Sequence, residues 1–167
     1  MKTRILVKEG EYRLAKAYCM DAKIDAQELY CFLTGMDKVQ LFLKAEEEVD
    51  PEIEEKYMEL IAKRAERIPL QHITGVQEFM GHTFKVSPDV LIPRQDTETL
   101  VELVLGDRRG KDGAWGRDNA YNKKTDLNRD TALLDVCTGS GCIAISLALM
   151  GGYGRVTALD VSEEALA

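Results

Sequence analysis

The chain has 167 residues, enough for one ordinary domain or two small ones. Hydrophobic residues make up 45% and charged residues 31% of it, which is the composition of a folded globular protein rather than a disordered one. The net charge of −7 argues against general binding to nucleic-acid phosphates, because proteins that bind them broadly are basic.

Neither a membrane segment nor a metal site is expected. The longest apolar run, residues 142–150, is too short to cross a bilayer, and the charged N-terminus has no signal-peptide core. The four cysteines form no Cys-x-x-Cys pair and there are only two histidines, so the spacing of a zinc site is absent. We therefore expect a cytoplasmic protein with reduced thiols; the cysteines are Cys19, Cys31, Cys137 and Cys142.

Residues 11–68 have the pattern of a small helical bundle. Asp25 with Glu28, and Asp37 with Gln40, resemble capping boxes that open helices, and Gly35 suits a helix end. Pro51 predicts the first position of a further helix. The side chains expected on the inner faces are Tyr12, Leu14, Ala15, Tyr18, Cys19, Leu29, Phe32, Leu33, Val39, Leu41, Phe42, Leu43, Ile53, Tyr57, Leu60, Ile61 and Ala65.

The next stretch changes from helical to strand-like. Short β-prone runs at 71–73, 77–79, 83–86 and 90–92 are separated by glycines and prolines, and Gly81 lies where a hairpin would reverse. A helix is then expected, with Asp96 or Thr97 as its N-cap. Residues 107–130 are rich in glycine, asparagine and charge, which predicts a flexible surface insert.

The last part of the chain predicts a strand, a glycine loop and a helix. Residues 131–136 form an apolar β-prone run, Gly139-Ser140-Gly141 follow, and residues 142–150 are small and apolar. A second strand over 155–160 ends in Asp160, about 20 residues after the loop, and a second helix starts at 162. A glycine loop followed at this distance by a carboxylate is typical of sites for adenosine-containing cofactors, where the carboxylate binds the ribose.

The spacing alone allows two kinds of cofactor. Residues 139–144 match the G-x-G-x-x-A pattern of nicotinamide-dependent dehydrogenases. Asp135, just before the loop, would instead repel a pyrophosphate and attract the ammonium or sulfonium of S-adenosylmethionine.

Several further segments resemble one family closely. They are residues 67–75 (RIPLQHITG), 78–81 (EFMG), 84–86 (FKV) and 91–98 (LIPRQDTE). Together they are similar to the bacterial release factor glutamine methyltransferases, the PrmC/HemK family. The resemblance implies an α plus α/β chain: a helical release-factor-binding domain at 1–70, a β-hairpin linker at 71–93, and at 94–167 the first part of a Rossmann-like methyltransferase domain that is cut short.

The family resemblance also implies a reaction and a set of site residues. A methyl group would pass from S-adenosylmethionine to the side-chain nitrogen of the glutamine in the Gly-Gly-Gln motif of peptide-chain release factors, by a monomeric enzyme. The resemblance places Arg94, Thr97 and Glu98 at the border of the active site. It assigns cofactor binding to Asp135, Cys137, Thr138, Gly139, Ser140, Gly141 and Asp160.

Three features depart from the family pattern. Cys137 stands in place of the usual first glycine of the loop, and a positive φ there would strain a cysteine. Gln95 stands in place of a proline. The family's acceptor-binding Asn-Pro-Pro-Tyr motif does not occur in the sequence; it is expected beyond Ala167, and the chain alone is expected to be inactive. A non-catalytic fragment that binds a partner is therefore the alternative to an enzyme.

Overall fold

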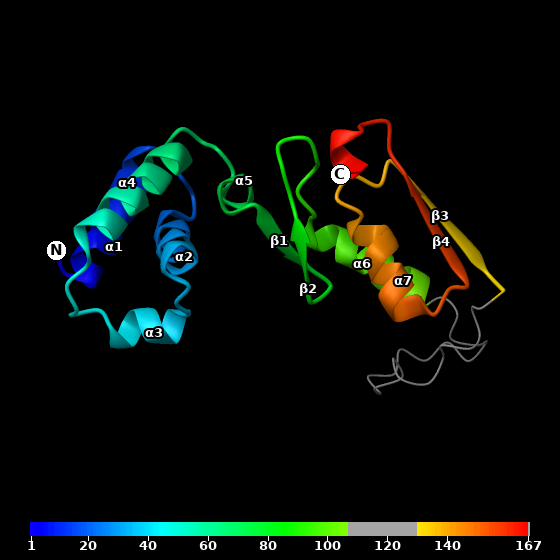
Figure 1. Cartoon of the computed structure of the whole chain (residues 1–167), viewed down its shortest axis with the longest axis horizontal. Helices are drawn as coiled ribbons and strands as arrows, with labels where there is room; N and C mark the ends of the chain where they lie inside the picture. The colour runs from blue at the N-terminus through cyan, green and yellow to red at the C-terminus, as the bar shows by residue number, and fades with distance from the viewer. Residues whose placement is uncertain (107–129, 167) are drawn as a thin grey trace. The chain divides into compact units, whose positions relative to one another are not determined.

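The computed structural model of the protein describes residues 1–106 and 130–166 (Figure 1). Nearly all of the predicted insert at 107–130 therefore lies outside the described residues. The chain forms two compact units, Met1–Gly75 and Val76–Ala167. Each unit has its own hydrophobic core, so each is described by itself.

The first unit is a helical bundle. Its main helices are α1 (Thr3–Lys16), α2 (Ala22–Thr34) and α4 (Pro51–Ala65), which pack against one another pairwise. The short helix α3 (Lys38–Leu43) lies beside α2, and α5 (Leu70–Thr74) packs on α2 and α4. The side chains at the centre of this bundle are Leu6, Leu14, Ala26, Leu29, Tyr57 and Ile61.

Local signals in the sequence place several helix ends correctly. Asp37 and Gln40 form the predicted capping box, each side chain accepting from the other residue's backbone N–H. Pro51 is the first residue of α4, after the N-cap Asp50, and Gly35 ends α2 in the left-handed conformation. These motifs depend on residues within a few positions of each other, which is why the sequence alone reveals them.

Helix α1, however, begins earlier than predicted, and the inner positions predicted around it are only partly correct, since Leu14 and Cys19 are buried but others are not. α1 starts at Thr3 because the N-terminus is held by the segment before α4: Thr3 N–H donates to Glu47 O and Val49 N–H donates to Met1 O. The predicted inner positions Tyr12 and Tyr18 are 54% and 83% exposed. Four residues of the next helices were also predicted to face inward but are exposed: Phe32, Val39, Phe42 and Leu43.

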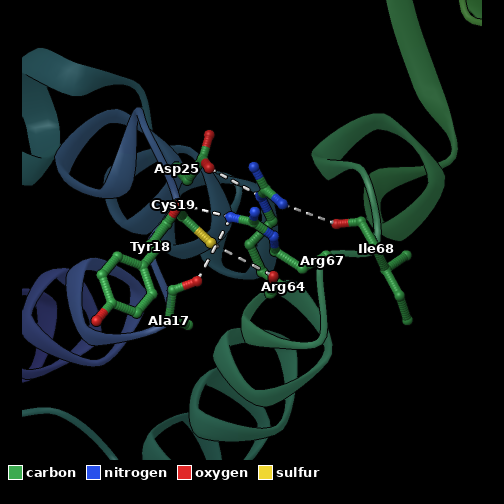
Figure 2. Close-up of polar contacts among 7 residues, drawn as sticks. All are labelled: Ala17, Tyr18, Cys19, Asp25, Arg64, Arg67 and Ile68. Carbon is green, nitrogen blue, oxygen red and sulfur yellow. Dashed lines mark hydrogen bonds and ion pairs between the residues drawn. The ribbon is translucent and has the colours of Figure 1, made fainter.

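Asp25 does not open α2, as its capping-box pattern had suggested. It lies one turn inside the helix, is buried, and accepts a hydrogen bond from Arg64 Nε of α4 at 2.8 Å. Figure 2 shows this pair together with a second arginine, Arg67, which donates to the backbone oxygens of Ala17 and Tyr18 at the end of α1. Buried charge pairing thus joins helices that are distant in sequence.

The second unit combines a hairpin, two helices and two parallel strands. Strands β1 (Val76–Phe79) and β2 (His82–Lys85) are antiparallel, whereas β3 (Ala132–Val136) and β4 (Arg155–Leu159) pair in parallel. Helix α7 (Cys142–Gly151) connects β3 to β4 and packs on both strands, and α6 (Gln95–Gly106) packs on α7 (Figure 1). A single turn of 3₁₀ helix, η2 (Glu164–Leu166), follows.

Three predictions for the middle of the chain need correction. Residues 71–73 are not a strand but part of α5, because Pro69 O accepts from His72 N–H and Gly75 closes the turn in the left-handed conformation. The run at 90–92 forms no strand, and the hairpin is confined to 76–85 with Gly81 at its reversal, as predicted. Helix α6 begins at Gln95, before either predicted N-cap, because Thr97 N–H already donates to Arg94 O.

The hairpin belongs to the core of the second unit. Its two phenylalanines, Phe79 and Phe84, are buried in one cluster with Val101 of α6 and with Cys142 and Leu147 of α7. None of the described helices is long and apolar enough to cross a bilayer.

Candidate cofactor-binding site

The candidate site is the loop of residues 137–141, which joins the end of β3 to the start of α7. Two backbone hydrogen bonds fix its course: Thr138 N–H donates to Leu159 O at 2.9 Å, and Gly141 N–H donates to Thr138 O at 3.0 Å. The first of these ties the loop to the last residue of β4. The loop therefore lies at the carboxyl ends of two parallel strands, where α/β sheets bind ligands.

Asp135 is oriented by a loop residue. Its Oδ2 accepts a hydrogen bond of 2.7 Å from Thr138 Oγ1, and Thr138 is itself buried. The side chain is thus held beside the loop, with Oδ1 and the remaining lone pair of Oδ2 left to interact with a ligand. A negative charge at this position favours a cationic ligand over a phosphate.

Asp160 connects the end of β4 to the same loop. Its Oδ2 accepts from Gly139 N–H at 2.8 Å and its Oδ1 accepts from Ser162 N–H at 3.0 Å. These backbone hydrogen bonds, from Ser162 and then Gly139, lower the pKa of Asp160 below its usual range. The ionised carboxylate has further lone pairs on both oxygens, which suits it to accept from ribose hydroxyls.

The two loop glycines leave the backbone bare. Both have positive φ, 55° at Gly139 and 74° at Gly141, which side-chain-bearing residues rarely adopt. A Cβ added at Gly139 would meet no atom within 4 Å, so the space above this peptide is open. A bare turn flanked by two oriented carboxylates fits an adenosine-containing cofactor that carries a positive charge.

Cys137 has the positive φ that the sequence had raised as a concern. Its φ is 62° and its side chain is exposed, so burial of the side chain does little to offset the strain. A non-glycine residue in this conformation costs about 1–2 kcal/mol. A cysteine in place of a glycine at this position therefore costs stability in the loop itself.

We expect Cys137→Gly to raise the free energy of unfolding of the second unit by about 0.5–1 kcal/mol, since relief of the strain exceeds the added entropy of an unfolded glycine. Hydrogen exchange of the α7 amides would measure this change. Gly139→Ala is the matched opposite, because it introduces a side chain at positive φ in open space, and it should destabilise the unit. Equal exchange in both variants would contradict the argument.

Among the described residues, none of the three residues placed at the border of the site has a side-chain hydrogen bond or ion pair with the loop. Glu98 Oε1 instead accepts a hydrogen bond of 2.6 Å from Met80 N–H, in the turn of the hairpin. In the part of the chain that the structure describes, the side chains of Arg94 and Thr97 form no hydrogen bond or ion pair. Their part in an active site remains a prediction.

Two backbone partners of the site were not predicted. Ser162 N–H binds Asp160, and Leu159 O anchors Thr138. The first has a signal in the sequence, because an aspartate commonly accepts from the N–H two residues later and a serine commonly begins a helical turn. The second depends on the pairing of β3 with β4, which no local pattern in the sequence specifies.

Among the described residues, no group of three or more His, Cys, Asp or Glu side chains is arranged to hold a metal ion.

Comparisons with known proteins agree with the resemblance seen in the sequence. Residues 6–75 match the family described as PrmC N-terminal domain. The chain is 40% identical over 144 residues to a release factor glutamine methyltransferase of Koribacter versatilis, covering 86% of this chain and 45% of the relative. It is 36% identical over 166 residues to that of Moorella thermoacetica, covering 99% and 53%.

A third relative, from Leptospira interrogans, has the same name and is 35% identical over 161 residues, covering 96% of this chain and 51% of the relative. The chain thus spans about half the length of the curated relatives it matches. Residues 6–75 therefore match the PrmC N-terminal domain family, and the chain is similar over most of its length to release factor glutamine methyltransferases.

Proposed function

We propose that this chain supplies the N-terminal domain and the S-adenosylmethionine-binding loop of a release factor glutamine methyltransferase. The observation that carries the proposal is the bracket formed by Asp160, whose carboxylate joins Gly139 N–H of the loop to Ser162 N–H after β4. With the Asp135–Thr138 pair, it provides two oriented negative charges around a bare glycine turn. Asp135 argues against a nicotinamide cofactor, because its negative charge would repel the pyrophosphate of that cofactor.

Within this proposal each residue has a defined part. Asp160 accepts from the ribose hydroxyls, and Asp135 faces the positive end of the cofactor. S-adenosylmethionine supplies an electrophilic methyl group on a sulfonium. Gly139 and Gly141 let the loop backbone approach the ligand closely, as part of the Rossmann-like domain that the parallel β3–α7–β4 unit begins.

The acceptor in this proposal is the side-chain amide of the glutamine in the Gly-Gly-Gln motif of release factors. An amide nitrogen is a weak nucleophile because its lone pair is delocalised, so it must be held in line with the methyl group. The Asn-Pro-Pro-Tyr motif that performs this task in the family does not occur among the 167 residues, whose prolines are Pro51, Pro69, Pro88 and Pro93. We expect the chain alone to bind cofactor without methylating a release factor.

Partner binding by the helical unit is the second candidate function, and one feature favours it. On α3 the side chains of Val39, Phe42 and Leu43 share one helix face at spacings of three and four residues, and all are at least 66% exposed. We propose that the helical unit binds the release factor away from the glutamine, in the cytoplasm and as a monomer. The net charge of −7 gives no support for a direct contact with nucleic acid.

Calorimetric titration with S-adenosylmethionine, with NADH as the matched control, tests the proposal. We expect saturable binding of S-adenosylmethionine and no binding of NADH. Saturable binding of NADH alone would refute the methyltransferase assignment. Binding of neither ligand would refute cofactor binding by this chain and leave partner binding by the helical unit.

A further inference from the structure

The turn of the hairpin contains a residue in an unfavourable conformation. Phe79 pairs with His82, so Met80 and Gly81 alone make the turn. Both have positive φ, 51° and 73°, as the two central residues of a type I′ turn require. Glycine adopts this conformation freely, whereas a methionine does so at a cost, and the structure must supply a compensating interaction for Met80.

Glu98 of α6 supplies that interaction. Its Oε1 accepts from Met80 N–H at 2.6 Å in a partly buried position, 18 residues along the chain. A hydrogen bond to an ionised acceptor is stronger than one between neutral groups. One carboxylate therefore fixes the strained turn and joins the hairpin to α6.

The hairpin shares a hydrophobic cluster with the start of α7. Phe79 is 1% exposed and lies edge-on to Phe84, with ring centroids 6.1 Å apart. Both rings share a buried cluster with Val101 and with Cys142, the first residue of α7. Cys142 directly follows Gly141, the last residue of the glycine loop. A continuous set of contacts therefore leads from Glu98 to the loop.

We propose that Glu98 is a positioning residue for the cofactor-binding loop: it holds Met80 in the left-handed conformation, latches the hairpin onto α6, and thereby braces Cys142 at the end of the loop. Glu98 touches no ligand in this proposal. Its relevance to S-adenosylmethionine rests on the proposed function, whereas the brace itself concerns only this chain and is measurable without a cofactor.

Thiol labelling of the full chain with N-ethylmaleimide, followed residue by residue by mass spectrometry, tests the brace. Cys137 is exposed and should react at once, whereas Cys142 is buried and burial raises the pKa of its thiol, so it should react slowly. We expect Glu98→Ala to speed the labelling of Cys142 about tenfold, through loss of one charge-assisted hydrogen bond. Cys19 and Cys31, buried in the helical unit, should keep their rates.

Glu102→Ala is the matched control, because Glu102 is exposed one turn along the same helix; it should label as the wild type does. Glu98→Gln keeps an acceptor oxygen without the charge, so it should give a rate of Cys142 labelling between those of the wild type and Glu98→Ala. It is the variant to use for the test if Glu98→Ala unfolds the second unit. Glu98→Ala should also have a smaller effect in a Met80→Gly background, where the turn no longer needs the latch.

Two results would overturn the proposal. One is a wild-type rate of Cys142 labelling in both Glu98 variants, above all if the variants still lose affinity for S-adenosylmethionine, since Glu98 would then act directly on the ligand. The other is an undiminished effect of Glu98→Ala in the Met80→Gly background. Failure of the wild-type chain to bind S-adenosylmethionine would refute the proposed function and leave the labelling result to stand.

Discussion

Replacing Arg64 with alanine is expected to lower the free energy of unfolding of the helical unit by about 3–5 kcal/mol, the cost of leaving a buried charge without its partner. The side chain of Asp25 is 8% exposed and that of Arg64 is 17% exposed, and Nε lies 2.8 Å from Oδ2. Without Arg64, the Asp25 carboxylate would remain inside the bundle with no cation beside it.

The expected loss is large because Arg64 also holds the end of its own helix (Figure 2). Its Nη1 donates to Ile68 O at 3.2 Å, a second hydrogen bond that alanine would remove, whereas the bond from Cys19 Sγ to its backbone oxygen would remain. Arg67 and Tyr18 beside it both have positive φ, 72° and 58°, and Arg67 donates to Tyr18 O. The cluster thus stabilises two strained residues where α1 and α4 end.

Hydrogen exchange of core amides such as those of Leu29 and Tyr57 would measure the stability of this unit separately. Lys63→Ala is the matched control, because Lys63 is the exposed neighbour on the same helix. Asp25→Ala should also destabilise the unit, and the double variant Asp25→Ala/Arg64→Ala should lose less than the sum of the two single changes. A loss below about 1 kcal/mol in Arg64→Ala would show that the pair behaves as an ordinary surface ion pair.

Asp25 illustrates what sequence analysis could not find in this fold. The capping signals at Asp37 and Pro51 and the stop at Gly35 were correct, because each is decided by neighbouring residues. Asp25 has the same local pattern, but its partner Arg64 is 39 positions away, and a buried ion pair overrode the local preference. Helix α5 was missed for a different reason: five residues are too few to show a helical period.

The candidate site, too, could be predicted from the sequence only in part. Strand, loop and helix follow one another in the predicted order, and the spacing from Gly139 to Asp160 anticipated a carboxylate that the structure places 2.8 Å from the loop. The positive φ of Cys137 was only a conditional concern in the sequence, since the residue type alone does not reveal the backbone conformation of that position. The bond from Glu98 to Met80 had no signal, because it depends on how the hairpin packs on α6.

Asp160→Ala is expected to weaken S-adenosylmethionine binding by at least about 100-fold, because it removes two charge-assisted hydrogen bonds that hold the loop as well as the proposed contacts to the ribose. Gly139 N–H and Ser162 N–H would both lose their acceptor. Calorimetry would measure the affinity, and Glu163→Ala, an exposed acidic neighbour, is the matched control. An affinity unchanged in Asp160→Ala would contradict the role given to this carboxylate.

The pH dependence of binding gives a second test of the same residue. Hydrogen bonds from Ser162 and Gly139 lower the pKa of Asp160 from its ordinary 3.8, so its carboxylate stays ionised throughout the range in which most proteins are handled. Because the pKa of Asp160 is lowered in the folded chain, the contribution of its carboxylate to stability is fully present above the ordinary pKa. That contribution is lost only as the pH falls through the lowered pKa. We therefore expect the affinity of the wild-type chain to stay constant between about pH 7 and pH 5, as a carboxylate with a lowered pKa requires. An affinity that falls within that interval, and falls equally in Glu163→Ala, would show that a group other than Asp160 controls binding.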